Sequence, residues 1–230
     1  MARGTDNNPR KSLVRNQLID KAAELFATRG YARTTMNDIA EELQLKRSSL
    51  YHYFGNKEEI LDALIEEQTV APTQMLKGLL ARRSGTSLEK IREALAQSIL
   101  RKLSESARFR VLDQIEFEMP EKQATQHRQM KRAVLELWSQ LIADGIKSGD
   151  LRRVDSRMAA FALLGITNWT AWWYSPGGKL TPEQIAAAMT DIGLFGLAAA
   201  QGETQKPERR VGAIIDALKA QIESLEKLAK

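Results

Sequence analysis

The sequence predicts an all-α protein in which a small N-terminal unit of short helices precedes a larger unit of long ones. Apolar residues recur every three or four positions through most of the chain, which is the period of a helix. Capping residues and Gly- or Ser-containing breaks separate these segments, and no stretch keeps the alternation of a strand. With 43% hydrophobic residues in a chain of 230, a substantial core can form.

Three helices are expected before residue 55, the second and third of them short. Residues 13–28 carry a helical stripe of apolar side chains. Thr35 is the expected N-cap of a second helix, with Asp38 three residues later in the carboxylate position of a capping box. A turn at Gln44 then leads into a third helix over residues 46–54. Two short helices therefore meet at one turn.

Longer helices are expected in the rest of the chain. Asn56 caps a fourth helix, and Glu59 completes its capping box. Beyond Pro72 the stretches "SGTS", "KSGD" and "SPGGK" mark the breaks. The expected helices between and after these breaks cover residues 87–103, 121–147, 155–173, 181–200 and 209–230.

The composition excludes several classes of site. The chain has no cysteine, which rules out disulfides, thiolate metal ligands and a Cys nucleophile. His52 and His127 are far apart in sequence, and no Gly-rich phosphate loop occurs. We therefore expect no enzyme, no catalytic residue, no metal site and no cofactor. Without an apolar signal peptide or membrane-spanning run, we expect a cytoplasmic protein with no membrane partner.

Positive charge is concentrated near the N-terminus. The net charge is +5, and residues 1–57 hold ten Lys or Arg against six Asp or Glu. Such a segment is compatible with nucleic acid, with an anionic membrane surface or with solubility alone. Charge does not choose among these three.

The stretch "LKRSSLYHYFGNKEEIL", residues 45–61, supplies the missing specificity. Two short helices around a turn form a helix-turn-helix, whose second helix enters the DNA major groove. A surface helix with solvated charges is the alternative, but the order of capped helix, turn, polar helix and recapped helix favours DNA binding. Phe54 is expected to point inward. The side chains expected at base edges or phosphates are those of Lys46, Arg47, Ser48, Ser49, Tyr51, His52, Tyr53 and Lys57.

Residues 34–61, "TTMNDIAEELQLKRSSLYHYFGNKEEIL", with "IDKAAELFATRGYARTTM" before them, resemble the DNA-binding segment of TetR-family transcriptional regulators. The resemblance implies a homodimer that binds double-stranded operator DNA and a small-molecule effector. It implies DNA contacts for Thr35, Arg47, Ser48, Tyr51, His52, Tyr53 and Lys57. Gln44 stands where such families usually have Gly; a positive φ there would cost Gln about 1 kcal/mol relative to Gly.

This resemblance also divides the chain. It implies a basic arm at residues 1–12, a helix-turn-helix domain at 13–57, and an effector-binding and dimerisation domain at 58–200. Residues 201–230, beyond the part of the chain that the resemblance covers, are expected to form a linker and an extra helix, which would pack on its own chain or on the partner. The dimer is expected to form through residues 155–173 and 181–200, with Gly193 allowing a close helix approach.

Residues 165–197, "GITNWTAWWYSPGGKLTPEQIAAAMTDIGLFGL", resemble the TetR-like regulators that respond to acyl-CoA or related CoA thioesters. The alternative for the tryptophans is core and dimer packing, and for Arg128, Lys131 and Arg132 a solvated helix face. His127 is expected at the surface. On the resemblance, the candidate effector-binding residues are Phe109, Arg128, Arg132, Trp169 and Trp172.

Together these features predict a ligand-controlled transcriptional regulator, a repressor in the usual case. It would bind an inverted-repeat operator as a homodimer and leave it when a small hydrophobic effector binds, an acyl-CoA or related CoA thioester by the resemblance. The alternative is a non-specific or architectural DNA-binding protein. Such a protein would not need a long helical domain with an apolar interior.

Overall fold

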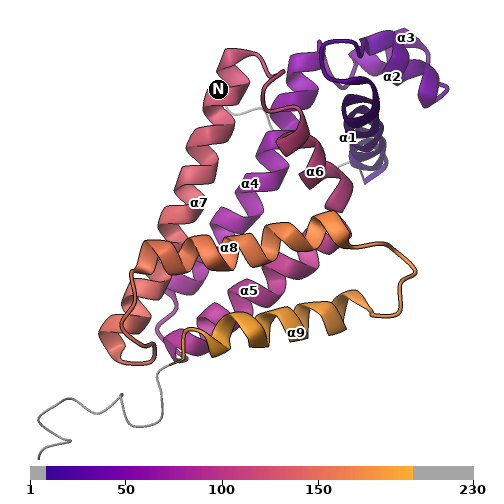
Figure 1. Cartoon of the computed structure of the whole chain (residues 1–230). Coiled ribbons are helices and arrows are strands. Elements are labelled where there is room, and N and C mark those ends of the chain that lie inside the picture. Colours follow the sequence, from indigo (N-terminus) through magenta and orange to yellow (C-terminus); the bar gives the residue numbers. More distant parts are fainter. Residues whose placement is uncertain (1–8, 199–230) are drawn as a thin grey trace, which may run out of the picture.

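The structure, a computed structural model, describes residues 9–198 and confirms the all-α class (Figure 1). Within this range strand-type pairing is limited to one isolated bridge between Leu151 and Ala198. The helices are α1 Pro9–Arg29, α2 Met36–Glu42, α3 Arg47–Tyr51, α4 Lys57–Ala81, α5 Ser87–Ser104, α6 Ser106–Gln114, α7 Glu121–Ser148, α8 Ser156–Trp173 and α9 Pro182–Phe195.

Two hydrophobic cores organise these helices. The first packs α1, α2 and α3 against the start of α4 and against α6. The second packs the end of α4 against α5, α7, α8 and α9. Figure 1 shows α1–α3 gathered at one end of the molecule, with α4 running from them into the larger bundle. At 25 residues α4 is about 37 Å long, so one continuous helix belongs to both cores.

The cores do not divide at the expected boundary between residues 57 and 58. The first core includes Ile60, Leu64 and Ile65 of α4 as well as Val111 and Ile115 near α6. The DNA-binding helices therefore share apolar packing with the helices that follow them. A displacement of α4 or α6 has a direct packing route to α1.

Several helix limits differ from expectation. The first helix begins at Pro9, so residues 9–12 of the expected arm are helical, and Pro is compatible with a first helical turn. α3 ends at Tyr51, earlier than expected. α4 continues through Pro72, where packing against α5 and α7 compensates for the missing N–H. Helix α6 was not expected. The predicted helix at 209–230 lies outside the described residues.

Gly193 lets α9 approach the second core closely, as predicted. A Cβ at this position would lie 2.8 Å from Cδ2 of Leu95 and 3.1 Å from Cδ2 of Leu163. Both leucines belong to the same chain, on α5 and α8. The close approach at Gly193 is therefore within one protomer. By contrast, Ala187 on the same helix is exposed.

Candidate DNA-binding surface and ligand cavity

The two turns that orient the DNA-binding helices are built as the sequence predicts. At the start of α2 the Asp38 amide donates to Thr35 Oγ1 (3.2 Å), and the Thr35 amide donates to an Asp38 carboxylate oxygen (2.7 Å). Hydrogen bonds from Thr35 hold the pKa of Asp38 below its usual value. Between α2 and α3, Gln44 has φ +54°, in the left-handed region. The sequence thus accepts a strained Gln at the turn that sets the helix crossing.

The exposed face of α3 carries the first group of predicted DNA contacts. Leu50 is fully buried beneath this face. Arg47 extends along the helix, where its Nη2 donates to the Tyr51 hydroxyl (3.3 Å) and its guanidinium lies 5.5 Å from the Tyr51 ring centre. This contact aligns the two side chains on one surface. The other predicted contacts that are exposed in the structure are Thr35, Lys46, Ser48 and His52.

The remaining predicted contacts are less accessible. Ser49 and Tyr53 are half-buried, and the Tyr53 ring packs against the first core. Lys57 donates through Nζ to the carbonyl oxygens of Tyr31 (2.8 Å) and Thr34 (3.0 Å). Its Nζ also lies 4.3 Å from the Tyr31 ring centre. A longer contact joins Nζ to the carbonyl oxygen of Ala32 (3.5 Å), so all three N–H groups of Lys57 have acceptors and fix the turn before α2 to the start of α4.

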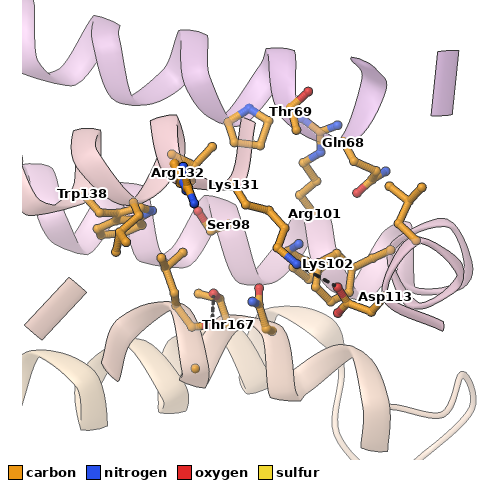
Figure 2. A pocket seen from close by; sticks show the side chains of 18 of the residues that line it. Gln68, Thr69, Ser98, Arg101, Lys102, Asp113, Lys131, Arg132, Trp138 and Thr167 are labelled. Atoms are coloured by element: carbon orange, nitrogen blue, oxygen red, sulfur yellow. Dashed lines mark hydrogen bonds and ion pairs between the residues drawn. The ribbon is translucent and has the colours of Figure 1, made fainter. Parts of the chain in front are cut away.

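A cavity of about 810 Å³ lies among helices α4, α5, α6, α7 and α8 (Figure 2). Its volume falls in the range of roughly 300–1,000 Å³ that ligand pockets occupy. Apolar surface comes from side chains such as Met75, Leu112, Val134 and Trp138. The cavity is strongly biased in charge, because Asp113 is the one carboxylate among its lining residues. The cationic side chains in the lining are Arg101, Lys102, Arg128, Lys131, Arg132 and Arg157.

The cations divide into an exposed set and an interior set. Arg128, Arg132 and Arg157 are exposed, on α7 and α8, and so is Lys131, which is paired with Glu116 (3.0 Å). Arg128 is bound to Glu121 (2.8 Å), and Arg157 lies 3.6 Å from Glu136, whereas Arg132 has no ion pair with another described residue. Arg128, Arg132 and Arg157 together form what we call the basic rim of the cavity. A ligand with an anionic end and an apolar body matches this arrangement.

The interior of the cavity contains two nitrogen groups that the sequence did not reveal. His127, expected at the surface, is 5% exposed, because α7 is covered by α4 on one side and α8 on another. Burial and the charge of Lys131 lower its pKa. Burial also lowers the pKa of Lys102 to about 7, and its Nζ lies 3.0 Å from the Phe109 ring centre. In the sequence, the position of Lys102 between Ile99 and Leu103, both of which are buried, was the available indication that Lys102 lies inside the protein.

The candidate effector residues separate into two groups. Phe109, Arg128 and Arg132 line the cavity, as the sequence suggested. Trp169 and Trp172 lie outside it, 67% and 41% exposed on the outer face of α8. The apolar period of α8 is consistent with either location, and only the placement of α5 and α7 decides which side faces inward. The structure therefore does not bring these two tryptophans together with the other candidate effector residues.

No described helix is both long and apolar enough to cross a membrane. Residues 9–198 also contain no cluster of three or more His, Asp or Glu side chains able to hold a metal ion.

These features define a helix-turn-helix DNA-binding protein with a separate ligand cavity. The family profile described as "Bacterial regulatory proteins, tetR family" matches residues 18–64, and "Tetracyclin repressor-like, C-terminal domain" matches residues 84–197. The HTH-type transcriptional repressor KstR2 of Rhodococcus jostii (strain RHA1) is 32% identical over 196 residues, which cover 84% of this chain and 95% of that relative. The chain belongs to the TetR family of transcriptional regulators and is not an enzyme.

Solved structures show the same fold. The ketosteroid transcriptional regulator KstR2 of Mycobacterium tuberculosis matches with a TM-score of 0.72 at 23% identity, covering 87% of this chain and 100% of that one. AibR in complex with isovaleryl coenzyme A and operator DNA matches with a TM-score of 0.61 at 25% identity, covering 77% and 96%. The second structure contains both ligand classes that the sequence predicts for this chain.

Proposed function

We propose that this protein is a transcriptional repressor whose homodimer binds an inverted-repeat operator and is released by an acyl-CoA or related CoA thioester. The observation that carries the effector class is the cavity, in which apolar walls meet a basic rim. A CoA thioester has the complementary form, with an apolar acyl group and an anionic phosphate end. The structure of AibR with isovaleryl coenzyme A and operator DNA supports this class by similarity.

The rim and the walls would divide the ligand between them. Arg132, which has no described ion-pair partner, and Arg128 and Arg157 would meet the phosphates. The acyl group would enter between Met75, Phe109 and the other apolar lining residues. Because Arg128 and Arg157 already contact carboxylates, phosphate would replace those partners. Of these three arginines, Arg132 has no described carboxylate partner that phosphate would have to replace.

The DNA contacts proposed for α3 are those that its exposed face presents. Arg47 can donate to guanine acceptors and Ser48 can contact either base type in the major groove. Tyr51, His52 and Lys46 would reach phosphates or further base edges. Ser49, Tyr53 and Lys57 would contribute less directly, because they are half-buried. Counterion release by such contacts makes the affinity fall steeply with salt.

The proposed dimer uses the outer faces of α8 and α9. Met158 (65% exposed), Trp169 (67%), Ile192 (63%) and Phe195 (90%) place large apolar side chains on these faces. Monomeric proteins rarely expose apolar patches of such extent, and an isologous interface would bury two copies together. Light scattering should therefore find a dimer at micromolar concentration. Trp169→Glu should give a folded monomer that has lost operator affinity, and a wild-type monomer would contradict the proposal.

Release from DNA requires the ligand to distinguish two conformations. The α3 helices of a dimer must meet successive major grooves about 34–36 Å apart. α4 joins the first core to the cavity wall at Pro72, so a ligand that shifts α4 changes this spacing. Equal affinity for both conformations would leave the operator bound, however tight the binding. A protein that binds operator DNA and CoA thioesters would act in the cytoplasm.

The test begins with operator fragments selected from genomic DNA by the purified protein. Fluorescence anisotropy of such a fragment, compared with random DNA, gives the specificity ratio that separates a regulator from an architectural protein. Acyl-CoA thioesters of increasing length are then added to the complex. Some members should release the DNA while free CoA and free acids act weakly. Release by an unrelated hydrophobic compound and by no thioester would contradict the effector class.

A further inference from the structure

The interior of the cavity contains a cationic side chain without an anionic partner. Lys102 on α5 has no hydrogen bond or ion pair within 4.0 Å to another described residue, and its ammonium rests on the Phe109 ring. Asp113 lies beside it in the same lining (Figure 2). However, Asp113 and Glu116 are both directed to Lys131, at 3.9 and 3.0 Å. Lys102 therefore lines the cavity without a direct carboxylate contact, although the charges of Asp113 and Glu105 offset part of the lowering of its pKa by burial.

His127 on α7 contributes a second unpaired group to the lining of the same cavity. Its side chain is 95% buried, with 5% exposed, and its Nδ1 has no hydrogen-bond partner among the described residues. Lys102 and His127 both belong to the lining of this cavity. Buried polar groups are normally hydrogen-bonded, and buried charges are normally paired. Two such vacancies facing one cavity indicate a ligand oxygen.

Exposure separates this pair from the basic rim. Arg128, Arg132 and Arg157 are exposed and suit phosphates that remain partly hydrated. Lys102 is half-buried and His127 is buried, so they face the part of the ligand that enters the protein. This inference rests on the proposed function, in which the part of the ligand that enters the protein is the acyl group of a CoA thioester. An unsubstituted acyl chain would leave both nitrogen groups unpaired.

We propose that Lys102 and His127 form a carboxylate subsite, so that the effector is a CoA thioester whose acyl chain carries a second carboxylate. The Lys102 ammonium donates to one carboxylate oxygen, and the Nδ1–H tautomer of His127 donates to the same group. Both vacancies are then filled by one anion. The CoA phosphates stay at the rim, and the chain between them lies along the apolar walls.

Isothermal titration calorimetry with matched thioesters tests this subsite directly. Adipoyl-CoA is compared with hexanoyl-CoA, and suberoyl-CoA with octanoyl-CoA, so that each pair differs in the terminal carboxylate. The wild-type protein should bind the carboxylate member of a fitting pair about tenfold or more tightly, as expected for charge-assisted hydrogen bonds in a buried site. Anisotropy of the operator complex should show the same order for DNA release.

Two variants assign the preference to the subsite. Lys102→Met should reduce it to less than about threefold and leave the affinity for hexanoyl-CoA within about twofold, because the charge–carboxylate contact is what is lost. His127→Leu should lower it in the same direction. Lys122→Met is the matched control, since Lys122 is exposed on α7 outside the cavity lining, and it should keep the full preference.

The outcomes separate the subsite from the proposed function. If unsubstituted thioesters bind and release DNA equally well, or if Lys102→Met keeps the preference, the carboxylate subsite is overturned and the proposed function stands. If no thioester binds, both are overturned. Thermal unfolding of each variant confirms that folding is retained, which is expected because removing an unpaired interior charge does not destabilise a core.

Discussion

Arg108 on α6 ties the DNA-binding helices to the rest of the chain, and its replacement by Met should loosen that connection. Its Nε donates to Asp20 Oδ1 on α1 (2.5 Å) and its Nη1 to Glu67 Oε2 on α4 (2.7 Å). Its Nη2 also donates to the carbonyl of Asn16 (3.3 Å). The side chain is 16% exposed. Arg108→Met keeps most of the aliphatic stem and removes all three hydrogen bonds at once.

The magnitude follows from the burial of each partner. Asp20 is 55% exposed, so its ion pair contributes little, about 0–1 kcal/mol. Glu67 is 26% exposed and keeps Arg15 at 3.0 Å after the change, so losing Arg108 costs about 1–2 kcal/mol there. With about 0.5 kcal/mol for the weak bond to Asn16, the total is about 1.5–3.5 kcal/mol in the free energy of unfolding.

Urea unfolding at neutral pH measures this loss against a matched control. Arg92→Met breaks the Arg92–Asp191 pair (2.6 Å), whose side chains are 54% and 65% exposed, and should cost less than about 1 kcal/mol. Arg108→Met should also raise the effector concentration needed to release the operator, because α1 no longer follows α4 and α6. If Arg108→Met were no more destabilising than Arg92→Met, the assigned role of these ion pairs would be wrong.

Three further predictions concern the core, the DNA surface and the cavity. Gly193→Val should lower the free energy of unfolding by about 1–3 kcal/mol, because the new side chain contacts Leu95. Gly78→Ala should raise it by about 0.5–1 kcal/mol, because the Cβ at this helical position meets open space. Thermal unfolding should therefore show a lower melting temperature for the first variant and a higher one for the second. Arg47→Ala should change the preferred base sequence in a selection from random operators, and unchanged preference and affinity would exclude α3 as the reading helix. Lys102→Met should raise the free energy of unfolding most at low pH, because burial lowers the pKa of Lys102 from 10.5 to about 7 and the folded protein must then hold a proton that burial disfavours. The gain should shrink as pH rises from 7 to 10.5. A gain that grows with pH would contradict this sign.

Local signals account for the features that the sequence predicts correctly. The capping box of Thr35 and Asp38 and the cap at Asn56 involve residues three positions apart, so their geometry is contained in the sequence. The positive φ of Gln44 follows from the short connection between two helices. The inward position of Phe54 follows from the apolar period. Each depends on neighbours within one turn.

Features decided by packing between distant helices were not predictable. α4 passes through Pro72 because α5 and α7 support it, although the proline alone favours a helix end. His127 reads as a polar residue on a charged helix, and only the positions of α4 and α8 bury it. Trp169 shows the opposite case, because it was a candidate for the interior and is exposed in the structure. Its helix is apolar on more than one face, and the sequence does not say which face packs inward. The spacing of apolar residues shows which side of a helix is apolar, but it does not show which other helix packs against that side.

Reciprocal coupling between operator and effector tests the central proposal most directly. The affinity of an acyl-CoA thioester that releases the operator is measured by calorimetry for the free protein and for the operator-bound protein. Thermodynamic linkage requires operator DNA to weaken thioester binding by the same factor by which the thioester weakens operator binding. We expect these two factors to agree and to exceed about fivefold. Equal thioester affinity in the presence and absence of operator would contradict ligand-controlled repression by this protein.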